Sequence, residues 1–319
     1  FLNDIYHDRM ILRDGKIPEE FVLSSPDFRT QCMRIQPPKS VYIHITATDL
    51  VCSTRGKWYA MEDSLSVPDG IAYPHFARKL CREIAPENYQ VPELCDNCGL
   101  DILLRQLYRD IMDDDPELEG GIVVLLSQGK QAPSYFVLCY MAKLTGAVVA
   151  EAEQLIVMDN KVYYRAPEGG FQRVAIIHRL ALDSMLDPLC FDEDTTCGVP
   201  HLMEAYCAGH IAIINAPGCS LAEDRGLHYF IPTMIRYYLD EEPILPNVPT
   251  FVPWYPEQKK YVLEHMDSLV FKDVSSDRRV GAVYGDTLTT QEKRELTQRI
   301  IREPRRYIAQ SRIEVETQP

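Results

Sequence analysis

The middle of the chain is a succession of continuous apolar runs separated by helical patterns. The runs are "GIVVLLS" (121–127), "AVVAEA" (147–152), "RVAIIHR" (173–179) and "HIAIINAPG" (210–218), each apolar enough for a strand covered on both faces. A helical pattern, "PSYFVLCYMAKLTG", lies between the first two runs, and another, "HLMEAYCAG", precedes the last. This alternation predicts a doubly wound parallel sheet over residues 121–218, whose ligand side lies beyond the carboxyl ends of the strands.

Short strands and two helices are predicted before this sheet. Residues 1–65 contain irregular segments with short strands, among them "VYIHITATDLV" and "KWYAMED". Two helices follow, one at about Tyr73–Ile84 and one at "GLDILLRQLYRDIMDD" (99–114). Apolar residues recur on one face of the second helix at Leu100, Leu103, Leu104, Leu107 and Ile111.

Hairpins and further helices complete the expected order of elements. The segment "LIVMDNKVYYR" predicts a hairpin that turns at Asp159-Asn160. After residue 218 the patterns predict a helix at about Ala222–Leu239, a hairpin between Leu269–Phe271 and Val280–Tyr284, a helix at the capping box Thr289-x-x-Glu292, and the strand "YIAQSRIEVE".

Charge and composition narrow the class of protein. The net charge of -14 argues against nucleic acid and anionic membrane surfaces as partners, because both would repel an acidic chain. No apolar run reaches the ~20 residues that span a bilayer, and no signal peptide is visible. Ten scattered cysteines indicate reduced residues of a cytoplasmic protein. The start at Phe1 rather than Met leaves open that the sequence is a piece of a longer protein.

Carboxylates at two neighbouring strand ends form the first candidate site. In "TDLVCSTRGKWYAMEDS", a turn at Arg55-Gly56 joins a strand that ends with Asp49 to one that ends with Glu62 and Asp63. A hairpin of this shape brings the two carboxylates together, and such pairs bind Mg²⁺ alongside substrate phosphates. Two solvated strand ends in an acidic protein would produce the same pattern, so the spacing leaves both interpretations open.

Two further segments suggest phosphate binding. Lys272 lies in the hairpin "LVFKDVSSDRRVGAVYG", where a lysine either guards a solvated strand end or reaches a phosphate. The segment "NAPGCSLAEDRGLHYFIP" leads from a buried strand through Pro217-Gly218 into a helix, and backbone N–H groups at such a helix start bind anions. Each signal is weak by itself, but all three point to phosphates and Mg²⁺.

The chain as a whole resembles the circularly permuted ATP-grasp family, relatives of the glutathionylspermidine synthetase type of amide ligase. Matching stretches run over nearly all 319 residues: "LNDIY", "ILRDGKIPEE", "TDLV", "MEDSLSVPDG", "LDPLCFDEDTTCGVPHL", "NAPGCSLAEDR", "IPTMIRYYLDEEPILPNVPT", "LVFKDV" and "YIAQ". The resemblance implies an α/β, circularly permuted ATP-grasp fold with a Rossmann-like doubly wound sheet and an antiparallel nucleotide-covering lobe. Asp49 and Glu62 precede Lys272, as the permutation requires.

The resemblance also implies a division of the chain. Residues 1–120 would carry the metal carboxylates and helices, residues 121–218 the doubly wound sheet, and residues 219–319 the nucleotide lobe with the Lys272 hairpin.

The activity implied is that of an ATP-dependent carboxylate–amine ligase, which forms an amide through an acyl phosphate. Its cofactors would be ATP and Mg²⁺, and its substrates a small-molecule or peptide carboxylate and an amine. Carried over by position, the metal ligands are Asp49 and Glu62, the nucleotide-binding residues are Lys272, Arg225, Gln310 and Gly281, and the arginines facing the phosphoryl group or substrate carboxylate are Arg78 and Arg179.

Several positions depart from the family pattern. Ser64 replaces an Asn beside the metal site, and apolar residues replace polar ones elsewhere. The loop after Lys272, "SSDRRVG", lacks the glycines that let backbone N–H groups approach phosphates, and Asp277 would repel them. The apolar replacements at expected polar positions are Phe76, Ala77, Val137, Leu138, Leu180 and Leu182.

Two functions therefore remain open from the sequence. One is an active ligase, whose phosphates Arg278 and Arg279 would help to hold. The other is a catalytically degenerate member that binds nucleotide or serves as a scaffold, with a protein partner or an active paralogue.

Overall fold

The computed structural model describes residues 1–89, 99–113, 115–274 and 281–315. The chain forms two compact units, each assembled from separate stretches of sequence. Unit 1 comprises Phe1–Arg34, Thr46–Leu65 and Gly218–Pro319, and unit 2 comprises Ile35–Ile45 and Ser66–Pro217. Asp277 and the two arginines after it, which the sequence places over the phosphates, lie outside the described residues.

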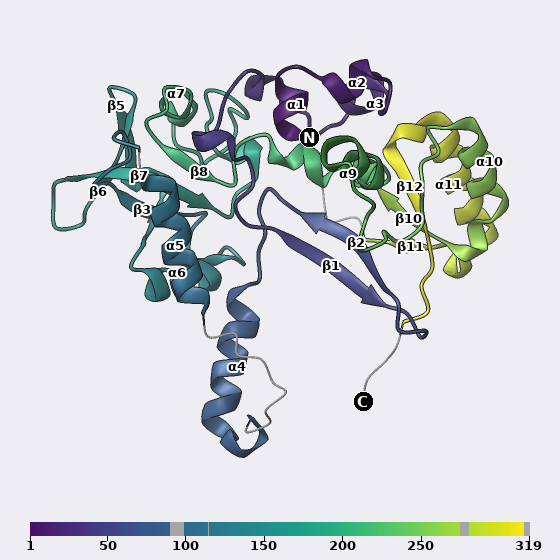
Figure 1. Ribbon diagram of the computed structural model, residues 1–319, viewed down its shortest axis with the longest axis horizontal. Helices are drawn as coiled ribbons and strands as arrows, with labels where there is room; N and C mark the ends of the chain where they lie inside the picture. Colours follow the sequence, from purple (N-terminus) through teal and green to yellow (C-terminus); the bar gives the residue numbers. More distant parts are fainter. Residues whose placement is uncertain (90–98, 114, 275–280, 316–319) are drawn as a thin grey trace. The chain divides into compact units, whose positions relative to one another are not determined.

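Unit 2 contains a mixed sheet. Its strands are β3 (Ile122–Ser127), β4 (Val148–Glu151), β5 (Leu155–Met158), β6 (Lys161–Arg165), β7 (Phe171–Arg179) and β8 (Ala212–Ile214). The order is β4-β3-β7-β6-β5, with β8 paired to β7 (Figure 1). Strands β4, β3, β7 and β8 run parallel, as the four apolar runs predict. The hairpin β5–β6 is antiparallel and joins the same sheet, because β7 begins three residues before its contact with β3, and those residues, Phe171–Arg173, pair with β6.

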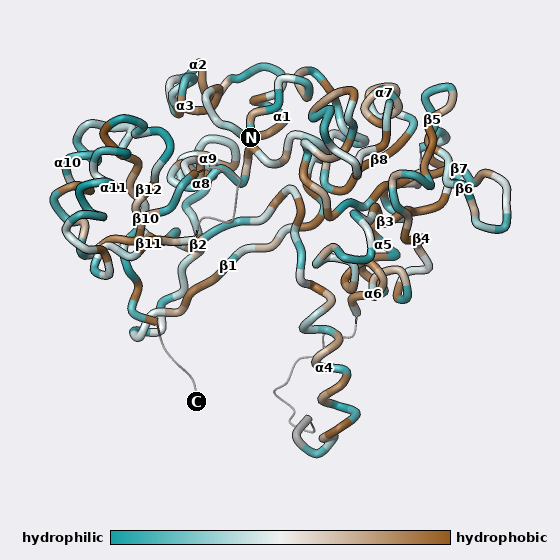
Figure 2. Tube along the Cα trace, turned by 180° about the vertical axis from the view of Figure 1, so that it is seen from behind, coloured by the Kyte–Doolittle hydropathy of each residue, from teal (hydrophilic) through white to brown (hydrophobic). Residues whose placement is uncertain are grey.

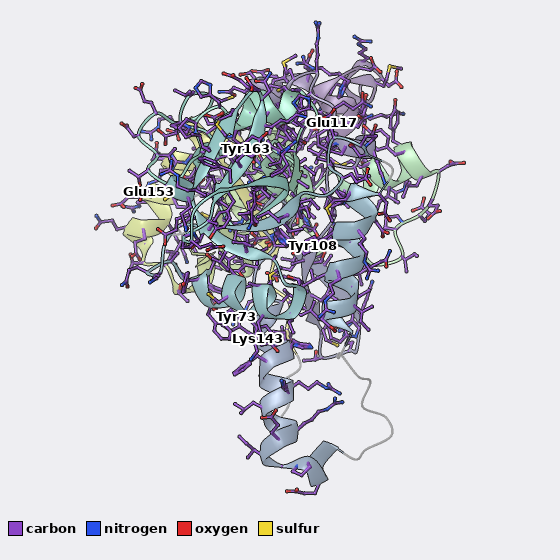
Figure 3. All side chains as sticks on the ribbon, turned by 90° about the vertical axis from the view of Figure 1, so that its left-hand side faces the viewer. Tyr73, Tyr108, Glu117, Lys143, Glu153 and Tyr163 are labelled. Carbon is purple, nitrogen blue, oxygen red and sulfur yellow. The ribbon has the colours of Figure 1, made fainter. Side chains whose placement is uncertain are left out.

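Helices cover this sheet with apolar side chains. They are α5 (Leu100–Met112), α6 (Tyr135–Thr145) and α7 (Leu202–Cys207). Helix α4 (Ala72–Ile84) buries only its first residue, Ala72, and leaves Tyr73, Phe76, Leu80 and Ile84 exposed. Helix α6 ends at Gly146, which has the positive φ of +82° that glycine adopts without strain. The predicted face of α5 needs one correction, since Leu103 is 69% exposed and Tyr108 is buried instead. Tyr108, labelled in Figure 3, continues the buried line of Leu100 and Leu104 by one helical turn.

Unit 1 contains two antiparallel sheets. The first is the hairpin of β1 (Ala47–Cys52) and β2 (Trp58–Ser64). The second has the order β11-β10-β12-β9 and consists of β9 (Thr250–Phe251), β10 (Leu269–Asp273), β11 (Val283–Tyr284) and β12 (Tyr307–Ser311). The predicted pairing of the Lys272 segment with Val283–Tyr284 is confirmed. In Figure 2 the trace near β5 and β8 of unit 2 is largely brown, which marks apolar residues.

The helices of unit 1 differ from the prediction at one place. They are α1 (Leu2–Tyr6), α2 (Met10–Arg13), α3 (Glu19–Leu23), α8 (Arg225–His228), α9 (Ile231–Leu239), α10 (Pro256–Glu264) and α11 (Thr290–Arg302). The single helix expected at 222–239 is broken, because Asp224 caps α8 through the Gly226 N–H at 2.7 Å and Pro232 begins a new helix. The capping box of α11 is present as predicted, with Thr289 and Glu292 bonded to each other's backbone.

None of the helices in the described part of the chain has the length and apolar character needed to cross a membrane.

Candidate functional site

The register of the β1–β2 hairpin places the two predicted carboxylates side by side. Gly56 turns the chain with φ +71°, and the strands then pair Asp49 with Glu62. Directly opposed residues of an antiparallel pair project from the same face of the sheet. Asp49 is exposed, whereas only 22% of the Glu62 side chain is accessible to solvent. The sequence prediction that this hairpin unites the carboxylates is therefore confirmed.

Two cations from distant parts of unit 1 bind Glu62. Lys272 of β10 places Nζ 3.3 Å from Glu62 Oε2, and Arg225 at the start of α8 places Nε 3.0 Å from Glu62 Oε1. The side chains of Lys272 and Arg225 are only 11% and 14% exposed. Glu62 thus bridges two cations at a half-buried position, where ion pairs are screened less than at the surface.

The electrostatics of Glu62 follow from this contact. Burial alone would raise the pKa of Glu62, but the charges and hydrogen bonds of Arg225 and Lys272 outweigh it and hold the pKa below its usual value. The three side chains together carry one net positive charge. A further anionic group would therefore be attracted to the two cations even with Glu62 ionised.

Arg225 is anchored from its other side by a residue that the sequence patterns did not single out. Its Nη1 donates to the backbone oxygen of Asp273 at 2.9 Å, and the Asp273 carboxylate accepts from Arg306 Nε at 2.8 Å. These contacts fix the guanidinium of Arg225 relative to β10, which carries Lys272. No local sequence signal links Arg225 to Asp273, because they are far apart in the chain.

A pocket of about 490 Å³ begins at these charged groups. Glu62, Arg225, Lys272 and Gln310 line its polar end. The remaining walls are mostly apolar and include Val51, Met61, Val248, Val270, Ile313 and Val315. An apolar cavity of a few hundred Å³ with a few convergent polar groups is the usual form of a small-molecule site.

The alternation of strand β10 explains how it serves this pocket. Leu269, Phe271 and Asp273 are buried, and Val270 and Lys272 project from the opposite face into the pocket. Gln310 of β12 is the register partner of Val270, and its Nε2 donates to the Thr250 hydroxyl at 3.1 Å. Gly281 also lines the pocket, and a side chain added there would meet nothing within 4 Å.

Arg179 lies in unit 2, at the end of β7, and its side chain has no exposed surface. Its guanidinium donates to the backbone oxygens of Asn215, Ala181 and Ala216 at 3.0, 2.7 and 3.2 Å. It also pairs with Asp183 Oδ1 at 2.6 Å. The group is enclosed, and these acceptors occupy four of its five N–H donors.

Arg78 and the apolar replacements also lie in unit 2. Arg78 is a half-buried residue of α4. Val137, Leu138 and Leu180 are at most 8% exposed and belong to the apolar core between the helices and the sheet, whereas Leu182 is 39% exposed. At three of these positions the departure from the family pattern thus contributes to a packed core.

A second acidic group, Asp63, lies beside Glu62; the sequence places it at the same strand end, but it is not among the metal ligands that the resemblance implies. Asp63 accepts from the Thr48 hydroxyl at 2.6 Å, and its other oxygen lies 3.7 Å from Nδ1 of His228. Burial would raise the pKa of Asp63, but the contacts with His228 and Thr48 lower it overall. Because Glu62 and Asp63 are adjacent in a strand, their side chains leave opposite faces. His228 belongs to no obvious sequence motif, so its contact with Asp63 could be found only in the folded structure.

The donor set at the hairpin fits Mg²⁺ only in part. Among the described residues, no group of three or more His, Cys, Asp or Glu side chains is arranged to hold a metal ion. Mg²⁺ in nucleotide sites uses one or two carboxylates and completes its shell with water and phosphate oxygens. The opposed pair Asp49 and Glu62 supplies that number, and the neighbouring cations suit the phosphates.

Comparison with known proteins identifies the family. The sequence model for "Circularly permuted ATP-grasp type 2" matches residues 1–319. An uncharacterized protein of Synechocystis sp. is 37% identical over 311 residues, which is 97% of this chain and 64% of the relative. An uncharacterized protein of Mycobacterium tuberculosis is 34% identical over 320 residues, or 100% of this chain and 57% of the relative. The chain therefore spans only about three fifths of the length of these relatives.

Two further similarities carry names. A protein of Frankia casuarinae named "Putative glutamate--cysteine ligase 2-2" is 32% identical over 321 residues, covering 100% of this chain and 37% of that protein. A solved structure of a glutathione synthetase-like effector from Globodera pallida, in its apo form, superposes with a TM-score of 0.56. It covers 99% of this chain and 69% of the effector, and at 12% identity it supports the fold alone.

Proposed function

The chain belongs to the circularly permuted ATP-grasp type 2 family, and from that premise we propose that it is the nucleotide-binding part of an ATP-dependent carboxylate–amine ligase. One observation carries the proposal: Lys272 and Arg225 converge on Glu62 in a pocket whose remaining walls are mostly apolar, with Tyr284, Ser311 and Arg312 as the further polar lining residues. An adenine nucleotide has the matching distribution of chemistry, with a planar base at one end and phosphates at the other.

The pocket residues have separate roles in holding the nucleotide. Lys272 and Arg225 neutralise the phosphates, Lys272 as a point charge and Arg225 through the fork of its guanidinium. The valines, Met61 and Ile313 enclose the base and exclude water from it. Gln310, which is 3% exposed, offers amide groups at the charged end. Gly281 leaves open space beside the phosphates.

Asp49 and Glu62 are the proposed ligands of a Mg²⁺ ion that accompanies the nucleotide. The ion would supply charge neutralisation for the phosphoryl group during transfer. Asp49 is exposed and carries no ion pair within the described ranges, so it can accept a cation without losing a partner. Glu62 already has two cationic partners.

The proposed reaction joins a carboxylate to an amine. A carboxylate oxygen attacks the γ-phosphorus of ATP and ADP departs; the amine nitrogen then attacks the acyl carbon, loses a proton and expels inorganic phosphate. The name of the Frankia relative, a glutamate–cysteine ligase, is consistent with small amino-acid substrates. The cations Lys272 and Arg225 stabilise the charge on the transferring group, which is the main requirement of phosphoryl transfer.

We assign the two predicted arginines of unit 2 different roles. Arg179 is a positioning residue that holds the turn at Asn215 and Ala216, because most of its N–H donors are occupied and its side chain is enclosed. Arg78 remains our candidate for contact with the phosphoryl group or the substrate carboxylate.

A degenerate, nucleotide-binding member of the family is the second candidate function. The observation that favours it is the burial of Val137, Leu138 and Leu180 in the core of unit 2, where the family pattern has polar residues. A charged substrate gains no partner from such positions, and desolvation without a partner costs several kcal/mol. In this case the protein would bind nucleotide, or serve as a scaffold for an active paralogue or another protein partner, without ligation.

Calorimetry and an ADP-release assay separate these functions. We expect MgATP to bind in the high micromolar range, since each missing charge-assisted contact costs on the order of 1.5–3 kcal/mol. Lys272→Ala should weaken binding by at least about tenfold. Lys293→Ala is the matched control, because Lys293 pairs with Asp267 and does not line the pocket.

The outcome with substrates decides between ligase and degenerate member. ADP release that requires both a carboxylate and an amine, and that disappears in Lys272→Ala, supports the ligase. MgATP binding without ADP release across amino acids, short peptides and amines supports the degenerate member. Absence of MgATP binding to the wild-type protein would contradict the ligase and the nucleotide-binding form of the degenerate member, and would leave only the scaffold role.

A further inference from the structure

Glu62 occupies the position that a phosphate group would take between Lys272 and Arg225. Each carboxylate oxygen has its own cation, with Oε1 at 3.0 Å from Arg225 Nε and Oε2 at 3.3 Å from Lys272 Nζ. A phosphate binds the same two donors through two of its oxygens. The carboxylate therefore acts as an internal anion for the phosphate-binding cations.

This internal anion competes with an incoming nucleotide. Glu62 is tethered to the site, so its effective concentration is far above that of a free ligand. Free ATP must displace the carboxylate from both cations, and the displaced charge would then face the triphosphate in a half-buried pocket. Like charges brought together in such surroundings repel strongly.

A metal ion changes this balance because Glu62 is also a proposed metal ligand. When the carboxylate shares its charge with a divalent cation, Lys272 and Arg225 lose their counter-ion and become available to phosphate oxygens. The repulsion between Glu62 and the phosphates is replaced by attraction to the shared cation. Glu62 can remain ionised both without and with the metal ion, because only its cationic partner changes.

We propose that Glu62 makes this pocket select the magnesium complex of the nucleotide over the free nucleotide. The inference rests on the proposed nucleotide site, and it adds a specificity-determining role to a residue otherwise assigned only as a metal ligand. Asp49 provides the contrast within the same hairpin. It is the register partner of Glu62, but it is exposed and pairs with neither Lys272 nor Arg225 in the described part of the chain.

The test measures ATP affinity by calorimetry with and without metal, in EDTA and in excess Mg²⁺. For the wild-type protein we expect binding in Mg²⁺ to be at least about tenfold tighter than in EDTA. Glu62→Gln removes the internal anion, so its affinity for ATP in EDTA should rise by about tenfold or more. The same variant should gain little or nothing from Mg²⁺.

Two further variants isolate the role of Glu62. Asp49→Asn should weaken binding in Mg²⁺ and leave binding in EDTA unchanged, because Asp49 does not occupy the cations. Asp267→Asn removes a carboxylate that pairs with Lys293 outside the pocket, and it should change neither measurement. The distinguishing result is that Glu62→Gln raises the affinity for ATP in EDTA and does not raise it in Mg²⁺.

Thermal denaturation shows whether the Glu62→Gln variant is folded. Glu62→Gln leaves two adjacent cations without a counter-ion, so its Tm should fall and recover on addition of inorganic tripolyphosphate in EDTA. If the variant does not fold even with tripolyphosphate, Glu62→Asp serves instead. The shorter aspartate side chain reaches the two cations less well, so metal-free ATP should again bind more tightly to this variant than to the wild-type protein.

The possible failures are distinguishable. Wild-type binding that is equally tight in EDTA and Mg²⁺, or a Glu62→Gln affinity in EDTA no higher than the wild type, would overturn the selection by Glu62 while leaving the nucleotide site in place. A wild-type protein that binds ATP in neither buffer contradicts the proposed function, and this inference with it.

Discussion

Residues of one chemical type have different roles in the two units. Arg225 is 14% exposed and projects a guanidinium to Glu62 at the pocket, whereas Arg179 is enclosed by backbone oxygens and Asp183. A buried guanidinium is stable only when its donors are paired, because an unpaired buried charge is costly. Arg179 therefore contributes to folding, and its effect should be visible in stability.

Replacing Arg179 by lysine tests this role. Lysine keeps the charge but cannot reproduce the planar fork that reaches four acceptors, so Arg179→Lys should lower the free energy of unfolding by about 3 kcal/mol. Arg236→Lys is the control, because Arg236 forms an exposed pair with Glu242 and such pairs contribute at most about 1 kcal/mol. Chemical denaturation at neutral pH measures both. Equally small losses in the free energy of unfolding of the two variants would show that the hydrogen bonds around Arg179 are not needed for stability.

His178 predicts a pH dependence in unit 2. It is 3% exposed, and burial together with the neighbouring charges of Arg179 and His44 lowers its pKa to about 4. An unfolded histidine titrates near 6.5, so between these values only the unfolded chain binds the proton. The free energy of unfolding should fall by about 2 kcal/mol from pH 7 to pH 5 through this residue, with no effect at higher pH.

The contribution of His178 is isolated by substitution. Tyr108 contacts His178 Nδ1 at 2.9 Å, and asparagine retains hydrogen-bonding groups there. His178→Asn should therefore reduce the loss of stability between pH 7 and pH 5 by about the same 2 kcal/mol. An unchanged pH dependence in this variant would contradict the assignment. His44, whose pKa burial also lowers, adds to the wild-type slope in the same direction and remains in both proteins.

At the scale of elements, strand β10 connects the core of unit 1 to its pocket. Leu269 and Phe271 pack against α10 and α11 residues such as Val262 and Ile300, and Val270 and Lys272 face the pocket. Any shift of the strand would therefore move Lys272. The hairpin partner β11 ends next to a close backbone approach, since a side chain at Gly285 would lie 1.7 Å from the backbone oxygen of Met266.

Gly285→Ala is the prediction at this scale. The obstacle is backbone rather than a flexible side chain, so the hairpin must move and stability should fall by roughly 1–3 kcal/mol or more. ATP binding should weaken as well, because β11 pairs directly with β10. Gly99→Ala is the matched control: φ is -80° there and no atom lies within 4 Å of an added carbon. If Gly285→Ala were as stable as the wild-type protein, the backbone near Met266 would accommodate the added methyl group without loss of stability, and this prediction would be wrong.

On the scale of the whole molecule, each unit is built from segments that are distant in sequence. The pocket draws on residues 51, 61, 62, 225, 248, 270, 272, 281, 282, 284, 310–313 and 315, all of which belong to unit 1. A ligand that binds this pocket should therefore stabilise unit 1 by mass action, since it binds the folded form of that unit.

Hydrogen exchange with and without MgATP tests whether the nucleotide stabilises unit 1. Slower exchange is expected in segments 47–64, 269–273 and 307–313, and little change in the β3 and β7 segments of unit 2. Lys272→Ala at the same nucleotide concentration should lose the protection. Protection confined to unit 2 would place the nucleotide elsewhere and contradict the proposed site.

Local patterns in the sequence determined most of the elements. Continuous apolar runs predicted β3, β4, β7 and β8, and the capping box predicted the start of α11. These features could be recognised because neighbouring residues alone set the apolar pattern of a strand, its turns and the helix caps. The sequence also predicted that Asp49 and Glu62 would meet, because a short hairpin fixes their register.

Only the tertiary structure decided which distant groups complete the site. The contact between Arg225 and Glu62 joins residues 163 positions apart, and the contact between Lys272 and Glu62 joins residues 210 positions apart. It also decided that Arg179 is enclosed and that Leu180 packs in the core, although an arginine and a leucine in sequence carry no record of their burial. The physical reason is that ion pairs, burial and pocket walls depend on through-space packing of many segments, while propensity and periodicity act over a few neighbouring residues.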